Sequence, residues 1–178
     1  GTRPRGANRG EDAALASELL ASPKDRAENL MIVDLVRNDL GRVCVPGSIE
    51  VPELFAIEAY ATLFQMVSTV QGRLRPGADR VDLLRAAFPA GSMTGAPKIA
   101  AIDLLAKLEP VPRGVYAGAL GWIDARGGAD LCVVIRTLLC RGRRAWLHAG
   151  GGIVLDSDPR AEWEETRDKA RAMIDALA

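Results

Sequence analysis

Hydrophobic and polar positions change their spacing several times along this chain, and the changes predict both helices and strands. Ser22, Pro23 and Asp25 form a typical helix start, because serine caps a helix while proline and an acid suit its first turn. Gly41 supplies the stop signal. The pattern therefore predicts a helix between these signals, with its apolar side formed by Leu30, Ile32, Val33, Leu35 and Val36.

The apolar pattern beyond this helix is mixed. Residues 49–73 show partial alternation, which indicates extended segments. Further helices are expected over residues 79–88, over residues 97–108 and from Pro159 onward.

The C-terminal half also contains three strand candidates, at residues 114–123, 129–140 and 145–154. Arg141-Gly142-Arg143 would join the last two as a tight hairpin. Since tight antiparallel links dominate this half, the pattern favours an α+β fold over a doubly wound parallel sheet.

Composition is that of a globular protein with one sizeable core. The chain has 178 residues, 48% of them hydrophobic, and its 23 basic residues balance 23 acidic ones. That balance argues against nucleic acid and against anionic membranes as partners. No apolar stretch approaches membrane-spanning length, and no signal-peptide pattern is present. Because no initiator methionine opens it, the chain looks like the interior of a longer protein.

Cysteine and histidine usage bears on metals and on the compartment. Cys44, Cys132 and Cys140 are scattered without a CxxC pair, and His148 is the single histidine. This set argues against a structural zinc site. Sparse, unpaired cysteines fit a reducing, cytoplasmic location.

A glycine-rich segment followed by an acidic helix is the first candidate site. Glycine lets the backbone of residues 150–152 approach a ligand closely, because glycine has no Cβ. Helical spacing places Glu162, Glu165 and Lys169 on roughly one face. Two acids and one ammonium beside bare backbone suit a hydrated cation and an anionic substrate. A solvated, salt-bridged helix after an ordinary turn would show the same pattern.

Arg136 is the second candidate. Strand alternation would place it on the same face as Cys132, Val134, Leu138 and Cys140. A guanidinium on such an apolar face needs a carboxylate partner, because an unpaired buried charge costs several kcal/mol. The partner is either a structural Asp or Glu, or a substrate carboxylate held bidentately.

Three weaker candidates complete the set. Glu28 has no helical ladder with Asp34 or Arg37, so it is either a solvated glutamate or a ligand. Residues 91–98 resemble a P-loop only superficially, because Ile99 follows the lysine where Ser or Thr is needed. They could still bind an anion through free backbone N–H groups at the start of the next helix. Tyr116 would need a partner for its hydroxyl if its ring is buried.

Six segments, taken in order, carry a resemblance to a known family. They are residues 1–6, 28–42, 91–98, 113–116, 135–137 and 149–169. Together they resemble the C-terminal part of the chorismate-utilising enzymes, which include anthranilate, aminodeoxychorismate, isochorismate and salicylate synthases. The resemblance covers essentially the whole chain. Glu28-Asn29-Leu30-Met31, Gly91-Ser92-Met93-Thr94-Gly95 and Gly150-Gly151-Gly152 are more similar to the aminodeoxychorismate branch than to the anthranilate branch.

The resemblance implies a fold and a set of roles. The fold is a four-layer α/β/β/α arrangement with orthogonally packed sheets, and residues 1–178 would be the C-terminal part of one catalytic domain whose N-terminal part is absent. Glu28 and Glu165 would bind Mg2+, with Glu162 acting through a water. Ser92, a hydroxyl near the substrate, and Gln65 would be the catalytic residues within this chain. The remaining roles concern binding of the substrate chorismate and belong to Thr2, Tyr116, Arg136, Gly150, Gly152 and Lys169.

Gln65 is an informative departure from the family. Many relatives carry histidine there, and in the anthranilate branch that histidine is linked to elimination of pyruvate. Glutamine cannot shuttle protons, so the resemblance implies amination without elimination, yielding 4-amino-4-deoxychorismate for p-aminobenzoate and folate synthesis. Anthranilate synthesis, or a catalytically incomplete fragment that only binds a ligand or partner, are the alternatives.

The resemblance also implies functions outside these residues. The family's lysine nucleophile and general-acid glutamate would lie upstream of Gly1, so we expect the isolated 178 residues to be inactive. Nitrogen would come from ammonia or from a glutamine amidotransferase subunit.

Overall fold

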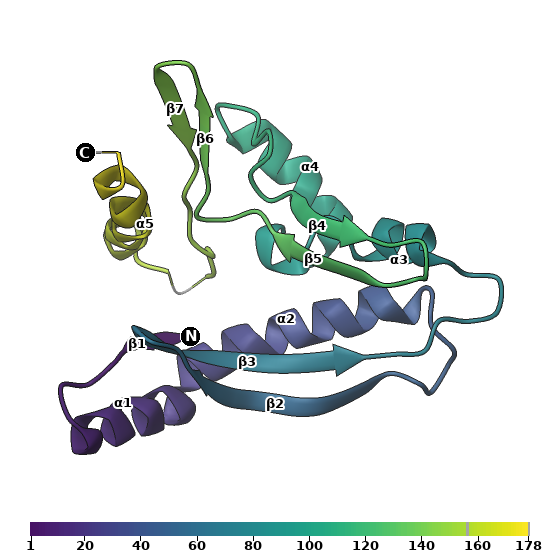
Figure 1. The fold of residues 1–178 in the computed structure, drawn as a ribbon, viewed down its shortest axis with the longest axis horizontal. Coiled ribbons are helices and arrows are strands. Elements are labelled where there is room, and N and C mark those ends of the chain that lie inside the picture. The colour runs from purple at the N-terminus through teal and green to yellow at the C-terminus, as the bar shows by residue number, and fades with distance from the viewer. Residues whose placement is uncertain (156, 178) are drawn as a thin grey trace. The chain divides into compact units, whose positions relative to one another are not determined.

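The chain divides into two compact units, which are described separately below. The computed structural model describes residues 1–155 and 157–177, and the units are Gly1–Gly91 and Ser92–Ala178 (Figure 1). Both combine helices with antiparallel strands, so the predicted α+β class is confirmed. The four-layer arrangement concerns a complete domain and stays a prediction.

An antiparallel sheet of three strands forms the centre of the first unit. Its order is β1 (Thr2–Pro4), β3 (Leu63–Gln71) and β2 (Glu50–Ala59), which confirms the extended segments expected within residues 49–73. Two register shifts interrupt β2, one on each side of Glu53. In the second shifted stretch Phe55 has φ 60°, and its N–H donates to Ser68 Oγ at 2.9 Å.

Three helices accompany this sheet. The predicted helix is α2 (Pro23–Gly41), and the Asp25 N–H donates to the capping Ser22 Oγ at 3.3 Å. The helix expected over residues 79–88 is α3 (Arg80–Ala87), which begins with an Asp79–Asp82 capping box. The pattern missed α1 (Arg9–Ala21) and also β1.

Two small clusters of buried side chains hold the first unit together. Leu19 of α1 is fully buried against Phe64 and Met66 of β3, so it fastens α1 to the sheet. Val43, Cys44 and Ala86 form the other cluster near α3. Figure 1 shows α2 running alongside β3, with which it is in contact.

Two separate hairpins and two helices build the second unit. The hairpins are β4 (Ala119–Ile123) with β5 (Ala129–Val133), and β6 (Leu138–Arg141) with β7 (Arg144–Leu147). The helices are α4 (Lys98–Leu108) and α5 (Pro159–Asp175), close to their predicted bounds. The expected hairpin at residues 141–143 is confirmed, with Gly142 at φ 61° in a two-residue loop.

The three strand candidates in this unit were too long. Residues 114–118 form turns rather than the start of β4, with φ above 60° at Gly114 and Ala117. Residues 129–140 are two strands, not one, because the backbone turns at residues 134–137. The glycines at 150–152 follow β7 as irregular chain.

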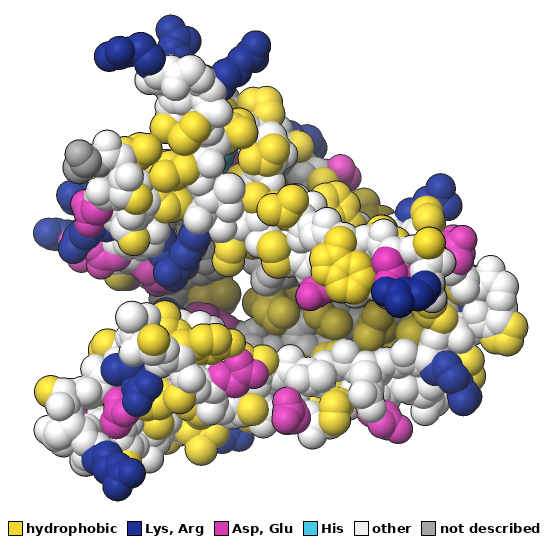
Figure 2. All heavy atoms as spheres, viewed as in Figure 1, with side chains coloured by type: hydrophobic (Ala, Val, Ile, Leu, Met, Phe, Trp, Pro, Cys, Tyr) yellow, Lys and Arg dark blue, Asp and Glu magenta, His cyan; other side chains and the backbone are white. Residues whose placement is uncertain are grey.

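Large apolar side chains remain exposed on the second unit, where every residue of β4 is exposed. Figure 2 shows hydrophobic side chains at the surface over β4–β7 and basic side chains at the tip of the β6–β7 hairpin. Among the helices of the described residues, none is long and apolar enough to cross a membrane.

Candidate functional site

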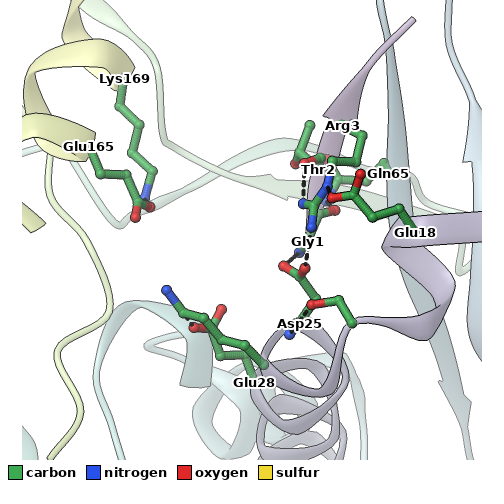
Figure 3. Close-up of polar contacts among 11 residues, drawn as sticks. Gly1, Thr2, Arg3, Glu18, Asp25, Glu28, Gln65, Glu165 and Lys169 are labelled. Carbon is green, nitrogen blue, oxygen red and sulfur yellow. Dashed lines mark hydrogen bonds and ion pairs between the residues drawn. The ribbon is translucent and has the colours of Figure 1, made fainter. Parts of the chain in front are cut away.

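The turn after β7 meets α5 through Lys169. Its ammonium lies 2.6 Å from Glu165 Oε1 and donates to the Gly150 carbonyl at 3.3 Å. The first of these contacts, visible in Figure 3, confirms that residues 165 and 169 share a helix face. The lysine thereby joins the glycine-rich segment to the acidic helix.

Glu162 is held on the same helix by the turn that precedes it. Ser157 Oγ donates to Glu162 Oε1 at 2.7 Å, and Asp158 caps α5 by accepting from the Ala161 N–H at 2.8 Å. A Cβ on Gly151 would lie 2.9 Å from Glu162 Oε2, so only a residue without a Cβ leaves this carboxylate where it is. The close approach of the Glu162 carboxylate therefore explains why glycine suits position 151.

Tyr116 brings a third segment to this turn. Its half-buried ring stacks on His148, with ring centroids 5.4 Å apart and planes 17° apart. A Cβ on Gly150 would lie 3.7 Å from the Tyr116 hydroxyl, which is ordinary contact. The structure thus gathers four predicted residues, Tyr116, Gly150, Glu165 and Lys169. Gly152 belongs to the same exposed turn, and a Cβ there would meet no described atom within 4 Å.

Arg113 and Glu109 were not singled out from the sequence. Arg113 donates from Nε and Nη2 to the Glu109 carboxylate at 2.9 and 2.6 Å, and from Nη1 to the Met93 carbonyl at 2.5 Å. The hydrogen bonds from Arg113 hold the pKa of Glu109 below its ordinary value, although burial opposes them. The i,i+4 spacing of opposite charges was the available sequence signal.

The prediction for the surroundings of Arg136 was wrong. It lies between β5 and β6 with φ 47°, so it does not continue the alternation of a strand. Its side chain is exposed rather than buried on an apolar face. Within residues 1–155 and 157–177, its guanidinium has no ion pair. The structural carboxylate partner is therefore not found there, and a role toward an external anion stays a prediction.

Ser92 lies in the short 3-10 helix η1 (Gly91–Met93) and is exposed. The next residue is the one whose carbonyl Arg113 binds, so this loop is fastened to the turn that carries Tyr116. The expected helix after the loop begins at Lys98, with Pro97 at its N-cap and no side-chain cap hydrogen bond. Ser92 therefore lies next to Met93, whose carbonyl is bound by Arg113, and precedes a helix whose N-terminus has no side-chain cap.

Thr2 and Gln65, both predicted site residues, meet in the first unit. They are register partners of β1 and β3, and Thr2 Oγ1 donates to Gln65 Oε1 at 3.0 Å (Figure 3). The Gln65 amide nitrogen donates to the Gly1 carbonyl at 3.0 Å. Both ends of this amide are thus engaged, and the side chain has one fixed orientation.

Glu28 projects from α2 with its side chain 42% exposed. The sequence argument overlooked Lys24, whose ammonium lies 3.8 Å from Glu28 Oε1 at i,i+4 spacing. The neighbouring Asn29 accepts a hydrogen bond from Ser68 Oγ at 2.5 Å, which fixes this turn of α2 against β3. Glu28 therefore has a weak surface partner on a well-anchored helix.

The carboxylates predicted to hold Mg2+ fit its chemistry. Glu162 and Glu165 stand one turn apart on α5 and offer carboxylate oxygens, the ligands that Mg2+ prefers. Among the described residues, no group of three or more His, Cys, Asp or Glu side chains forms a ready cage. Mg2+ commonly takes one or two protein carboxylates and completes its shell with water and substrate oxygens. Participation of Glu28, in the first unit, stays a prediction.

Comparison with known proteins gives consistent matches over nearly the whole chain. A family model described as chorismate binding enzyme matches residues 1–175. The chain is 54% identical over 177 residues to an aminodeoxychorismate synthase of Streptomyces pristinaespiralis, covering 99% of this chain and 25% of that protein. It is 51% identical over 177 residues to anthranilate synthase component 1 of Spirochaeta aurantia, covering 99% of this chain and 37% of that protein.

A solved structure agrees with these matches. Anthranilate synthase component I from Streptococcus pneumoniae superposes with a TM-score of 0.83 at 43% identity, over 97% of this chain and 39% of that one. The chain therefore spans only a quarter to two fifths of the length of these three relatives.

Proposed function

Because this chain belongs to the family of chorismate binding enzymes, we propose that it contributes the chorismate site of a longer enzyme that makes 4-amino-4-deoxychorismate. In that reaction a carbon–nitrogen bond forms to ammonia at the ring carbon that bears the hydroxyl, and the hydroxyl leaves as water. The enolpyruvyl ether stays intact. Anthranilate synthesis differs because the nitrogen is added to the ring carbon next to the carboxylate and because pyruvate is also expelled.

The turn after β7 supports the binding of a carboxylate. Lys169 supplies a cation that is already placed against this turn, and the exposed Gly150 and Gly152 leave backbone accessible. Tyr116 adds an aromatic ring with a hydroxyl beside Gly150. Chorismate is a dianion, so a cation, bare backbone and a hydroxyl together match one of its carboxylates.

Arg136 is suited to a second anionic group. An exposed guanidinium without an ion pair among the described residues keeps its fork of donors available for a carboxylate. Glycine would be the usual residue at a positive φ, so arginine adopts φ 47° here at some conformational cost. We infer that this side chain binds substrate rather than stabilising the fold.

The negative charges of the acidic helix and of chorismate call for a divalent cation at this site. Glu162 and Glu165 carry the same sign as chorismate, and Lys169 neutralises only one of them. Mg2+ held by Glu165 and Glu28, with Glu162 behind a water, would supply positive charge for the substrate carboxylate. Lys169, which contacts Glu165, would add positive charge for the same dianion.

The glutamine at position 65 favours amination of chorismate without elimination of pyruvate. Its amide is held by Thr2 and by the Gly1 carbonyl, and a carboxamide neither gains nor loses a proton as an acid or base near neutral pH. A group in this position cannot serve as the base or acid for pyruvate loss. The product would therefore keep its side chain and feed p-aminobenzoate and folate synthesis, with nitrogen from ammonia or from a glutamine amidotransferase subunit.

Product analysis tests the proposal. The complete protein that carries this sequence is incubated with chorismate, ammonium and Mg2+, and the products are separated by chromatography. We expect 4-amino-4-deoxychorismate without anthranilate. Anthranilate as the main product would overturn the proposed reaction.

A pair of variants tests the metal. Glu165→Gln removes one proposed ligand and should lower activity about tenfold or more. Glu164→Gln is the matched control, because Glu164 is the preceding residue of α5 and pairs with Arg160 at 3.3 Å instead. Full activity in EDTA, or in the double variant Glu28→Gln/Glu165→Gln, would contradict the role of Mg2+.

A further inference from the structure

Arg113 connects the end of α4 with two segments that carry candidate site residues, the Ser92 loop and the turn that contains Tyr116. Its nitrogens bind the Glu109 carboxylate just after α4 and the Met93 carbonyl of the loop that contains Ser92. Its guanidinium carbon lies 5.9 Å from the centroid of the Tyr116 ring, within the range of a cation–π contact. Among the described residues of the second unit, no other arginine donates hydrogen bonds both to a carboxylate and to a backbone carbonyl.

The contact continues from Tyr116 into the glycine-rich turn. Tyr116 has Arg113 as one ring neighbour and His148 as another, with the stacked His148 ring 5.4 Å away. His148 follows β7 and lies two residues before Gly150. A Cβ added to Gly150 would lie 3.7 Å from the Tyr116 hydroxyl. The orientation of the Tyr116 ring is therefore coupled to both Arg113 and the turn.

Arg113 differs from Arg136 in what it has left to offer a ligand. All three nitrogens of Arg113 are engaged, and its side chain is only 26% exposed. A bidentate pair with Glu109 fixes the plane of the guanidinium, because two parallel hydrogen bonds allow a single orientation. Such an arginine holds other groups in place rather than binding an incoming carboxylate.

We propose that Arg113, fixed by Glu109, is a positioning residue that holds Tyr116 and the Ser92 loop in register with the glycine-rich turn. This inference rests on the proposed function, because Tyr116 is taken to contact chorismate. Lysine cannot replace Arg113, since one ammonium cannot keep both the bidentate pair and the bond to the Met93 carbonyl. Neutral Glu109→Gln keeps the shape but loses the charge that orients Arg113.

The test measures ring geometry and ligand affinity in the same protein. The complete protein is labelled with ¹³C-histidine, and the His148 resonance is assigned by its loss in His148→Gln. Stacking on Tyr116 shifts this resonance, so it reports the ring arrangement without substrate. Chorismate affinity is then measured by calorimetry. The variants are Arg113→Lys, Arg113→Met and Glu109→Gln, with Arg126→Lys as control because Arg126 is 93% exposed and pairs only loosely, at 3.6 Å, with Asp124.

We expect all three network variants to move the His148 resonance and to weaken chorismate binding, roughly tenfold for Arg113→Lys. Arg126→Lys should change neither. An unmoved resonance in folded Arg113→Lys and Glu109→Gln, or unchanged chorismate affinity in both, would overturn the positioning role. If Arg113→Met does not fold, these two milder variants decide. Failure of the unmodified protein to bind chorismate would instead refute the proposed function, a distinct result.

Discussion

Leu19 offers a sharp test of how α1 is attached to the sheet. It is the one large side chain among the described residues that is fully buried, and it packs on Phe64 and Met66. Leu19→Ala removes three carbon groups at about 0.8 kcal/mol each, or about 2.4 kcal/mol. The cavity left behind adds to this, although a cluster of three buried side chains can partly collapse into it, so we expect about 3 kcal/mol in total.

Leu20 is the matched control for this change. It is the next residue of the same helix and is 44% exposed, so Leu20→Ala loses only part of the transfer term and should cost about 1 kcal/mol. Both changes have the same effect on helix propensity. The difference between the two variants therefore isolates burial at residue 19.

Urea unfolding of the 178-residue chain followed by circular dichroism measures both costs. At a slope of about 2 kcal/mol per molar urea, the Leu19→Ala midpoint should fall by about 1.5 M and the Leu20→Ala midpoint by about 0.5 M. Equal midpoints for the two variants would refute the placement of α1 against β3.

Three further predictions concern the site and its supports. Arg136→Lys should weaken chorismate binding about tenfold with little change in thermal stability, because the charge stays while the fork is lost; a lower melting temperature with unchanged KM would show a structural role. Gly151→Ala should leave the melting temperature nearly unchanged yet raise the Mg2+ concentration needed for activity, because the new Cβ displaces the flexible end of Glu162; an unchanged Mg2+ requirement would contradict it. The hydrogen bonds from Arg5 lower the pKa of Asp12 from 3.8 to about 2, so its stabilising effect is complete above pH 3.8 and fades as pH falls toward 2. The gap in melting temperature between the unmodified protein and Asp12→Asn should therefore narrow over that range, and a gap independent of pH would contradict the assignment.

Local sequence signals predicted much of the fold. The Ser22-Pro23 start and the Pro159 start placed α2 and α5 correctly, because capping is a local interaction. The missed helix α1 also had a signal, since Asn8 caps it by accepting from the Glu11 N–H and an acid at that third position is typical of a helix start. Periodicity did not predict α1 because its apolar face is small.

Contacts between distant segments could not be predicted in this way. Spacing alone indicated the Glu165–Lys169 pair, because both residues are on one helix. Alternation failed at Arg136 because β5 already ends at Val133, and Arg136, with φ 47°, lies in the turn before β6 with its side chain exposed. The stacking of Tyr116 on His148 joins residues 32 positions apart and depends on the folded turn. The resemblance to chorismate-utilising enzymes, by contrast, is confirmed by the family match.

The most direct test of the chorismate site is a calorimetric titration of chorismate into the complete protein with Mg2+ present. Lys169→Met removes the ammonium that binds the Gly150 carbonyl and Glu165, while Arg167→Met, two residues earlier on α5, is the matched control. We predict saturable binding that weakens about tenfold or more in Lys169→Met and changes less than about twofold in Arg167→Met. Absence of binding to the unmodified protein, or equal affinity in both variants, would contradict the account.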